Sequence, residues 1–197
     1  MNVDDRRLTR ISTQELGRRW NLVRDHMKER GLRALIIQSE RDFTGGYVKW
    51  FTDIPAYYPR TVIFHASDMM TVVEHGAAGR RRSLEGKDGE NPGVGEILTT
   101  SAFPSVNYTQ TYDAEAVSDV LSRRGYRKIG LVGVAGMRHG FVACLENTQS
   151  AAEISDETDF VDRVKAVKSE EEIALIKQAA QMQDAVFSKV LSRIKPA

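Results

Sequence analysis

Short apolar runs that follow amphipathic stretches constrain the fold of this chain more than any other feature. Near the amino end, four apolar residues recur at helical spacing: Leu16, Trp20, Val23 and Met27. Arg30 and Gly31 give this helix a C-terminal end, since one is a cation and the other adopts positive φ freely. The apolar run at 34–37 is then typical of a buried strand after a tight turn. Helix and strand in succession predict an α/β domain.

Two segments have the sequence of a capping box. In the first, the Ser12 hydroxyl is expected to accept a hydrogen bond from the Glu15 amide, and the Glu15 carboxylate to reach back to the Ser12 amide. Ser169 and Glu172 repeat the spacing, with three acids at the positive end of the helix that follows. We expect that helix to run over 170–193, about 36 Å. It carries an apolar stripe: Ile173, Ile176, Ala180, Phe187, Val190 and Ile194.

The middle of the chain favours strands and loops. Residues 47–51 are rich in aromatic side chains and are predicted to form a strand. The segment 52–60 contains two prolines and is predicted to be a loop. Two β-branched runs, 61–64 and 71–73, predict a hairpin. Six glycines between residues 76 and 95 predict a long mobile loop.

The rest of the body alternates again. A helix over 113–124, a strand over 129–134, a helix over 139–148 and a short strand over 159–161 are predicted. The order of these elements predicts an α/β fold with a mixed β-sheet flanked by helices, followed by a long C-terminal helix.

Composition excludes several classes of protein. The 197 residues carry a net charge of +1, so the chain has no general attraction to nucleic acid or anionic lipid. No apolar run approaches the ~18–20 residues of a membrane span. One cysteine, Cys144, cannot form an internal disulfide, which fits a reducing compartment. We therefore expect a cytoplasmic protein with no nucleic-acid partner and no membrane partner.

The sequence lacks the short motifs of common hydrolases and nucleotide-binding proteins, including His-Glu-x-x-His, Gly-x-Ser-x-Gly and the P-loop. His65 and His75 close the two hairpin strands beside Glu74, which leaves a metal site open as one interpretation and strand-end polarity as the stronger one. Three arginines at 80–82 fit either a solvated loop or a patch for an anion. No catalytic or metal-binding residue is therefore predicted in this chain.

One aromatic segment is the candidate for recognition. Aromatic and arginine side chains dominate recognition surfaces. Those proposed here for the edge of a substrate site are Trp50, Tyr57, Tyr58 and Arg60. The alternative is that the rings cover the end of the sheet and that Arg60 pairs with an acid such as Asp53.

The segment from Val164 to Ala180 resembles the junction between the two domains of creatinase, prolidase and aminopeptidase P, the pita-bread metallohydrolases. It reads Val-Lys-Ala-Val-Lys-Ser-Glu-Glu-Glu-Ile-Ala-Leu-Ile-Lys-Gln-Ala-Ala. Two upstream segments agree with that family: Gly-Leu-Arg-Ala-Leu-Ile-Ile at 31–37 and Phe-Thr-Gly-Gly at 43–46. The resemblance covers nearly the whole chain.

The resemblance implies a family-type amino-terminal domain at 1–163 and, at 164–197, the junction and first helix leading to a catalytic domain. In the family that domain binds two divalent metal ions, for which Mn, Co or Zn is expected, through residues with no match in this chain. It also implies a homodimer, with this domain at the edge of the active site. Arg60 matches an arginine that contacts substrate in creatinase-like members.

Three functions remain open at this stage. The first is the non-catalytic domain of an Xaa-Pro peptidase, in contact with its own catalytic domain. The second is a free-standing binding or dimerisation module. The third is the corresponding domain of a creatinase-like amidohydrolase of small molecules.

Overall fold

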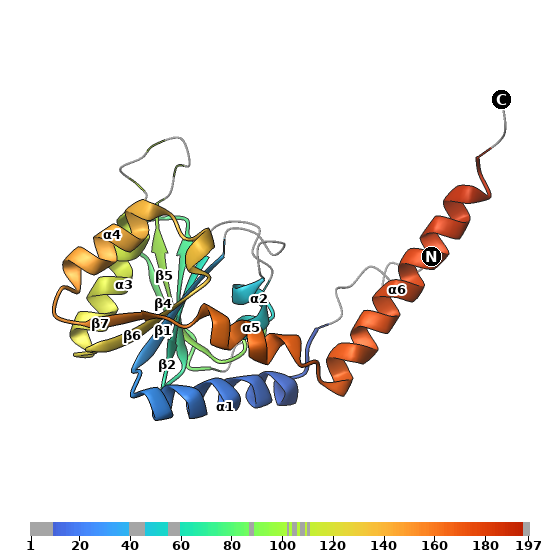
Figure 1. Ribbon diagram of the computed structural model, residues 1–197. Coiled ribbons are helices and arrows are strands. Elements are labelled where there is room, and N and C mark those ends of the chain that lie inside the picture. Colours follow the sequence, from blue (N-terminus) through green and yellow to red (C-terminus); the bar gives the residue numbers. More distant parts are fainter. Residues whose placement is uncertain are drawn as a thin grey trace.

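In the computed structural model, seven strands among the described residues form one mixed sheet (Figure 1). The structure describes residues 10–39, 46–54, 60–86, 89–101, 103, 106, 109 and 111–194. The strand order is β4-β5-β3-β2-β1-β6-β7. The strands are β1 (Ala34–Ser39), β2 (Arg60–His65), β3 (Met70–His75), β4 (Arg81–Ser83), β5 (Val94–Thr100), β6 (Lys128–Val132) and β7 (Glu153–Asp156). Strands β2 and β4 run antiparallel to their neighbours, and the other five share one direction.

Helices cover both faces of this sheet (Figure 1). On one face lie α1 (Thr13–Arg30), α2 (Tyr47–Thr52) and α5 (Thr158–Ala166), and on the other α3 (Tyr112–Arg123) and α4 (His139–Thr148). A short 3-10 turn, η3 (Val134–Gly136), follows β6. The last helix, α6 (Glu170–Leu191), projects away from this body (Figure 1). The predicted fold class, a mixed sheet flanked by helices with a long C-terminal helix, is confirmed.

The core is divided by the sheet, as the alternation of side chains along a strand requires. Leu35 and Ile37 of β1 pack with α1 and α2, whereas Ala34 and Ile36 pack with α3 and α4. All four are fully buried, which explains why this run is apolar without interruption. The packing around Gly130 of the neighbouring β6 leaves no room for a side chain, because a Cβ there would lie 2.5 Å from the Leu35 side chain.

The helix ends largely follow the sequence. Gly31 has φ of 70° and its amide donates to the carbonyl groups of Lys28 and Met27, as its position predicts. Ser169 and Glu172 form a complete capping box. At Ser12 only half of the prediction holds: the hydroxyl accepts from the Glu15 amide, but the Ser12 amide donates to Glu171 on α6.

The strand prediction for residues 47–51 is wrong, because these residues form helix α2. Tyr47, Val48, Trp50 and Phe51 are buried, while Lys49 is exposed. Counted from Tyr47, these buried residues lie at positions i, i+1, i+3 and i+4, which is the spacing of a helix face and not the alternation of a strand. The aromatic content of the segment was a weaker signal than this spacing.

Two further predictions need correction. Residues 159–161 belong to helix α5, and the last strand, β7, lies earlier at Glu153–Asp156. Ile154 is the sole apolar residue of this edge strand, so its sequence carries almost no strand signal. The predicted loop over 76–95 contains β4 and the beginning of β5, joined by turns at Gly86 and Gly93 that have positive φ.

The other predicted elements are confirmed: the hairpin of β2 and β3, the helices α3 and α4, and the strand β6. No helix among the described residues is long and apolar enough to cross a membrane.

Candidate functional site

Polar side chains gather at the edge of the sheet where the parallel strands end. Open α/β sheets bind ligands outside the carboxyl ends of their strands. At this edge β3 ends with Glu74 and His75, β5 ends with Thr100, and the antiparallel β2 begins with Arg60. The first turn of α3 adds Asp113. We call these five residues the carboxyl-edge cluster.

Arg60 lies across the hairpin from Glu74. Its Nη2 atom donates to Glu74 Oε2 at 2.9 Å, and the two side chains are 21% and 30% exposed. The alternative partner considered from the sequence, Asp53, accepts instead from the Ile11 amide. Arg60 Nη1 is buried and has no hydrogen-bond partner among the described residues. A buried donor without a partner is costly, so this nitrogen favours a ligand that offers an acceptor.

His75 forms the second half of the cluster. Its Nε2 atom lies 2.9 Å from Asp113 Oδ2, and the Thr100 hydroxyl donates to Asp113 Oδ1 at 2.5 Å. Side chains from two strands therefore converge on one carboxylate of α3, which fixes the orientation of the imidazole.

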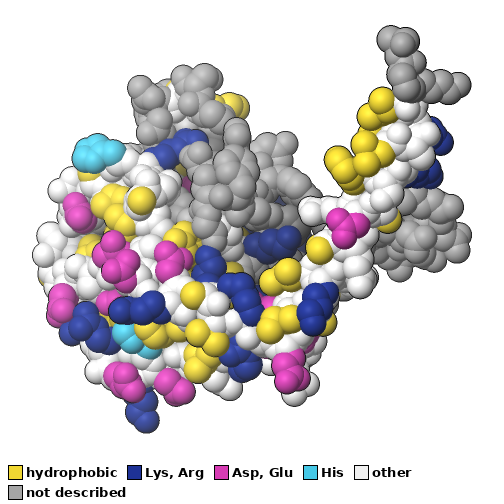
Figure 2. Space-filling view, turned by 45° about the vertical axis from the view of Figure 1, so that its right-hand side comes forward, with side chains coloured by type: hydrophobic (Ala, Val, Ile, Leu, Met, Phe, Trp, Pro, Cys, Tyr) yellow, Lys and Arg dark blue, Asp and Glu magenta, His cyan; other side chains and the backbone are white. Residues whose placement is uncertain are grey.

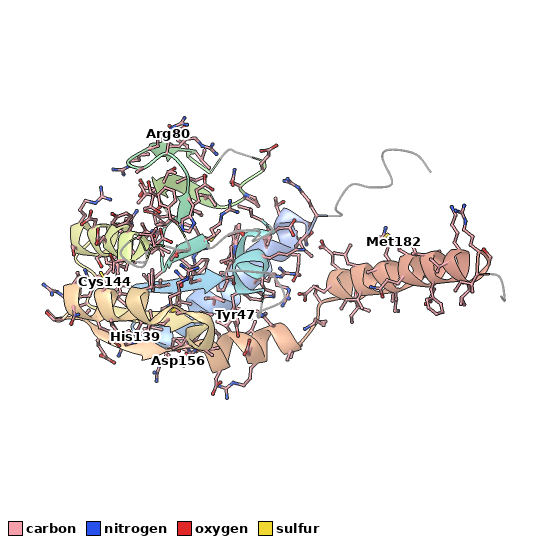
Figure 3. All side chains as sticks on the ribbon, turned by 90° about the horizontal axis from the view of Figure 1, so that it is seen from above. Tyr47, Arg80, His139, Cys144, Asp156 and Met182 are labelled. Atoms are coloured by element: carbon pink, nitrogen blue, oxygen red, sulfur yellow. The ribbon has the colours of Figure 1, made fainter. Side chains whose placement is uncertain are left out.

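A cavity of about 630 Å³ adjoins the cluster at Thr100. It lies between α3 and the edge strands β4 and β5, and both signs of charge line it. Arg80 and Arg81 come from the arginine-rich segment, and Arg81 pairs with Glu96 at 2.6 Å. Figure 3 shows Arg80 on the body, well away from α6. The residues that line this cavity include Arg80, Arg81, Thr100, Tyr112, Asp119 and Arg123.

The structure separates the candidates that the sequence grouped. Arg60 belongs to the carboxyl-edge cluster. Trp50 is 8% exposed and lies 5.2 Å under the guanidinium of Arg19, near the attachment of α6. Tyr57 and Tyr58 lie outside the described residues.

The attachment of α6 is a second polar site, which the sequence did not reveal. Arg19 on α1 is almost fully buried, and donates to Glu15 Oε1 at 3.0 Å, to Glu172 Oε1 at 2.9 Å and to the Trp50 carbonyl at 2.9 Å. Glu171 accepts from the amide and the hydroxyl of Ser12, at 2.7 Å and 2.6 Å. We call Ser12, Arg19, Glu171 and Glu172 the junction clamp. It ties the first turn of α6 to the first turns of α1.

A smaller cavity of about 330 Å³ lies beside this clamp. Its apolar wall combines the body with the beginning of α6 and consists of Ile11, Trp50, Leu175 and Ile176. Lys49, Lys165 and Lys168 add positive charge at its edge. Burial lowers the pKa of Lys165, whose ammonium lies 4.0 Å over the Tyr47 ring.

Other titratable side chains lie outside both sites. Burial lowers the pKa of His65 to about 4, so this imidazole stays neutral inside the sheet layer. His26 contacts the buried Glu157 at 2.8 Å and stacks on Phe160. Burial raises the pKa of the Cys144 thiol, which disfavours a reactive thiolate.

The part of the chain that the structure describes contains no group of three or more His, Cys, Asp or Glu side chains that could hold a metal ion. The carboxyl-edge cluster offers the Arg60–Glu74 ion pair and a free guanidinium nitrogen, which suit recognition of a carboxylate.

No family model and no curated protein matches this sequence. The fold, however, is similar to that of solved peptidases. An Xaa-Pro dipeptidase from Bacillus anthracis matches 92% of this chain with a TM-score of 0.64 at 16% identity, and the match covers 44% of the dipeptidase. A prolidase from Thermococcus sibiricus matches 94% of this chain with a TM-score of 0.64 at 14% identity, and 46% of the prolidase is covered.

A shorter structure shows which part of such peptidases corresponds to this fold. The N-terminal domain of a cytoplasmic peptidase from Mycobacterium tuberculosis matches 74% of this chain with a TM-score of 0.50 at 11% identity, and 97% of that domain is covered. This chain therefore has the fold of the amino-terminal domain of Xaa-Pro peptidases, and it spans less than half the length of the two longer structures.

Proposed function

We propose that this chain is the amino-terminal, non-catalytic domain of a metal-dependent Xaa-Pro peptidase. The observation that carries the proposal is the correspondence of nearly the whole chain, 92% and 94%, to less than half of an Xaa-Pro dipeptidase and a prolidase. The junction sequence that follows Val164 supports the same relationship. The peptide-bond chemistry would belong to the catalytic part of such an enzyme, where a pair of divalent ions such as Mn, Co or Zn activates water.

The contribution of this domain is to border the active site and bind the substrate. We assign that task to Arg60, because its Nη1 atom is buried without a partner while Nη2 is fixed by Glu74. A guanidinium held at one nitrogen can still bind a substrate carboxylate with the other. A dipeptide presents such a carboxylate. Tyr57 and Tyr58 remain candidates for the same edge, whereas Trp50 is assigned to the attachment of α6.

The first test is an assay of the purified chain with Xaa-Pro dipeptides and added manganese, cobalt or zinc. We expect no turnover, because the described residues offer no metal-binding cluster. Metal-dependent hydrolysis that co-purifies with the chain through repeated chromatography would contradict the proposal.

The second test is Arg60→Ala, made both in this chain and in a full-length peptidase that contains it. In the peptidase, kcat/KM should fall at least tenfold, about 1.4 kcal/mol of lost transition-state binding. In this chain, the free energy of unfolding should change by about 1 kcal/mol or less, as for other partly exposed ion pairs. Arg81→Ala is a matched control, since Arg81 also pairs with a glutamate on the next strand. A kcat/KM that is unaffected by Arg60→Ala would leave this residue with a structural role only.

We also propose that the chain self-associates. Beyond Leu175, every described residue of the last helix and its end is exposed, including several large apolar side chains. Burying one such side chain is worth about 1.5–3 kcal/mol, so an arrangement that covers several of them is favoured.

A further inference from the structure

The edge strand β4 leaves half of its backbone groups without a partner strand, as every edge strand does. All three of its residues, Arg81–Ser83, are exposed. Figure 3 shows Arg80, the residue before this strand, well away from α6. The hydrophobic side chains that Figure 2 shows along α6, beyond the body, therefore belong to a different surface. The open edge at β4 is a feature of the body itself.

The register of β4 shows which of its backbone groups are open. The carbonyl of Arg80 accepts from the Thr99 amide on β5 at 2.9 Å, and the amide of Leu84 donates to β5 at 2.8 Å. In an antiparallel pair, only every second residue bonds to a given neighbour. The amide and the carbonyl of Arg81 and of Ser83 therefore point away from β5. These four groups can form hydrogen bonds to one further strand.

A groove lies beside this edge, on the face of the sheet that α3 covers. It is the cavity of about 630 Å³ between α3 and the edge strands, to which Leu98 and Ala116 contribute apolar surface. We call it the edge groove. A strand added to β4 would place every second side chain over the edge groove. Domains that bind extended peptides combine these two features, since the strand edge provides main-chain hydrogen bonds and the groove selects side chains.

Two arginines at the edge groove carry charges that the described residues do not neutralise. In the described part of the chain, the side chain of Arg80 has no hydrogen bond or ion pair, and Arg123 only donates from Nε to the Asp119 carbonyl. Arg80 lies opposite Thr99 and so near the beginning of α3, whereas Arg123 lies at its end. Glu115 and Asp119 lie between them on α3, so the ends of the groove are more positive than its middle.

The length of the groove matches a short extended segment. The α3 wall from Glu115 to Arg123 is about 12 Å long, and four residues of extended chain span about 13 Å. Two side chains that are four residues apart on a strand point to the same face. They can therefore reach both ends of the groove, while the side chain midway between them lies over its centre.

We propose that the edge groove binds an extended acidic segment of a partner protein as an additional strand beside β4. The main chain of the segment bonds to the open groups of Arg81 and Ser83. Two acidic side chains, four residues apart, lie near Arg80 and Arg123. An apolar side chain midway between them contacts Leu98.

The same arginines disfavour other strands at this edge. Pairing of β4 with β4 of a second copy would bring residues 80–82 of the two chains together, and like charges on facing strands are destabilising. Basic segments are disfavoured in the same way. Charged side chains ordinarily protect an edge strand from pairing, and here their sign leaves an acidic strand as the favoured one.

The edge groove is separate from the proposed substrate edge. Arg60 and Glu74 lie on the same face of the sheet as Val62 and Val72, which pack with α1 and α2. The edge groove lies on the opposite face, beside α3. The inference therefore goes beyond the proposed function, and a failure of peptide binding would leave the assays of hydrolysis and of Arg60 unaffected.

The test is fluorescence anisotropy of the whole chain with a labelled nine-residue peptide that has blocked ends. The peptide carries glutamate at positions three and seven, valine at position five and threonine elsewhere. We expect a Kd of about 0.1 mM or tighter, and a Kd at least about tenfold weaker when lysine replaces both glutamates. Arg80→Glu and Arg123→Glu should each raise the Kd about tenfold. Arg127→Glu, at an exposed position beside β6, is the matched control and should leave the Kd unchanged.

Changes to backbone groups separate strand addition from simple attraction of charge. N-methylation of the peptide at positions four and six blocks one edge of its strand, and N-methylation at positions five and seven blocks the other. One of these peptides should bind at least about tenfold more weakly, and the other within about threefold of the original. Ser83→Pro removes an amide that points away from β5. It should raise the Kd about tenfold and leave the body folded, as judged by tryptophan fluorescence.

Several results would overturn the proposal. One is the absence of binding up to about 1 mM peptide, and another is a Kd that neither Arg80→Glu nor Arg123→Glu changes. Equal binding of the two N-methylated peptides, or displacement by inorganic phosphate as effective as that by unlabelled peptide, would show attraction of anions only. In a full-length peptidase that contains this chain, the Kd should lie within about threefold of that for the chain alone. Loss of binding there would show that the rest of the enzyme covers the groove, and would contradict the proposal.

Discussion

The body and α6 are both regular structure, but different forces specify them. Every α-helix of the body has at least one buried residue, whereas the structure records no buried residue in the 22 residues of α6. The helix is specified locally by its capping box, by the acids of its first turn and by a sequence rich in good helix formers. Beyond Leu175 every described residue of α6 is exposed, so burial against the body does not specify that stretch.

The two regions meet through polar contacts, and this too distinguishes α6. Elements of the body are joined mainly by apolar side chains, whereas α6 begins at the ion pairs and hydrogen bonds of the junction clamp. Directional contacts of this kind fix an angle better than an apolar contact does. The clamp therefore sets the direction in which α6 leaves the body.

The largest expected difference between the regions is the response to loss of a phenylalanine. Phe51→Ala in the core should lower the free energy of unfolding by about 3–5 kcal/mol, because the ring is fully buried. Phe187→Ala on α6 should change it by less than about 0.5 kcal/mol in dilute solution, since that ring is 64% exposed. Urea unfolding followed by tryptophan fluorescence measures the body alone, because Trp20 and Trp50 both lie there. Equal losses in the two variants would mean that α6 folds as part of the body.

The next effect is expected at the clamp. Arg19→Ala should cost roughly 3 kcal/mol, because it leaves the nearly buried Glu15 and Glu172 without their shared cation. It should also make α6 more susceptible to limited proteolysis. Arg18→Ala is the matched control: Arg18 also pairs with Glu15, but it is 41% exposed and should cost about 1 kcal/mol or less. Proteolysis of α6 that is unchanged by Arg19→Ala would show that other contacts hold the helix.

The sequence predicted the body better than the junction, and particular residues show why. The stripe of α1 and the apolar run of β1 are local patterns, so their periods identify them directly. The clamp joins Ser12 to Glu171 and Arg19 to Glu172, more than 150 residues apart in the chain. No local period encodes such a pairing. The sequence did offer one signal, because Glu171 is a second acid beside the capping residue Glu172. The body uses Glu171 as a hydrogen-bond acceptor for Ser12.

The candidate site was predicted only in part, for the same reason. Arg60 was identified correctly as a charged residue at the beginning of a strand, but its partner Glu74 lies on the next strand of the hairpin. In the predicted hairpin Arg60 precedes the first run and Glu74 follows the second, which puts both at the same edge, so this pair could have been found. The contact of His75 with Asp113 could not, because α3 follows a long connection whose path the sequence does not define.

Acid should affect the body through His65. Burial, with a smaller effect of the nearby Arg124, lowers the pKa of this histidine to about 4, from 6.5. Between these values the unfolded chain binds a proton that the folded body excludes, so the free energy of unfolding should fall as the pH falls from about 6.5 to about 4. The loss should reach roughly 2–3 kcal/mol. Asp68, Arg24 and Thr71 also surround the ring.

The measurement is the urea midpoint against pH for the original chain and for His65→Gln. The variant should show a flatter profile in this window, whatever its absolute stability. His139→Gln, which removes an exposed imidazole on α4, is the control and should leave the profile unchanged. A profile that stays equally steep in His65→Gln would assign the acid sensitivity to other groups. Burial opposes a low pKa at Glu157, but its hydrogen bonds to His26 and Ser155 lower the pKa of this carboxyl overall. Its protonation should therefore reduce the free energy of unfolding at still lower pH.

The smallest expected effects compare the N-terminal caps of the two regions. Ser12→Ala removes the acceptor for the Glu15 amide and the hydroxyl that donates to Glu171, so it should lower the free energy of unfolding of the body by about 1 kcal/mol. Ser169→Ala removes the corresponding cap of α6, where nothing is buried, and should change the fluorescence-detected transition by less than about 0.5 kcal/mol. Helicity measured by circular dichroism should respond in the opposite order, because α6 relies on its cap more than α1 does. If Ser169→Ala shifted the body transition as much as Ser12→Ala, the capping box of α6 would be coupled to the body through Glu172, and the separation of the two regions would be wrong.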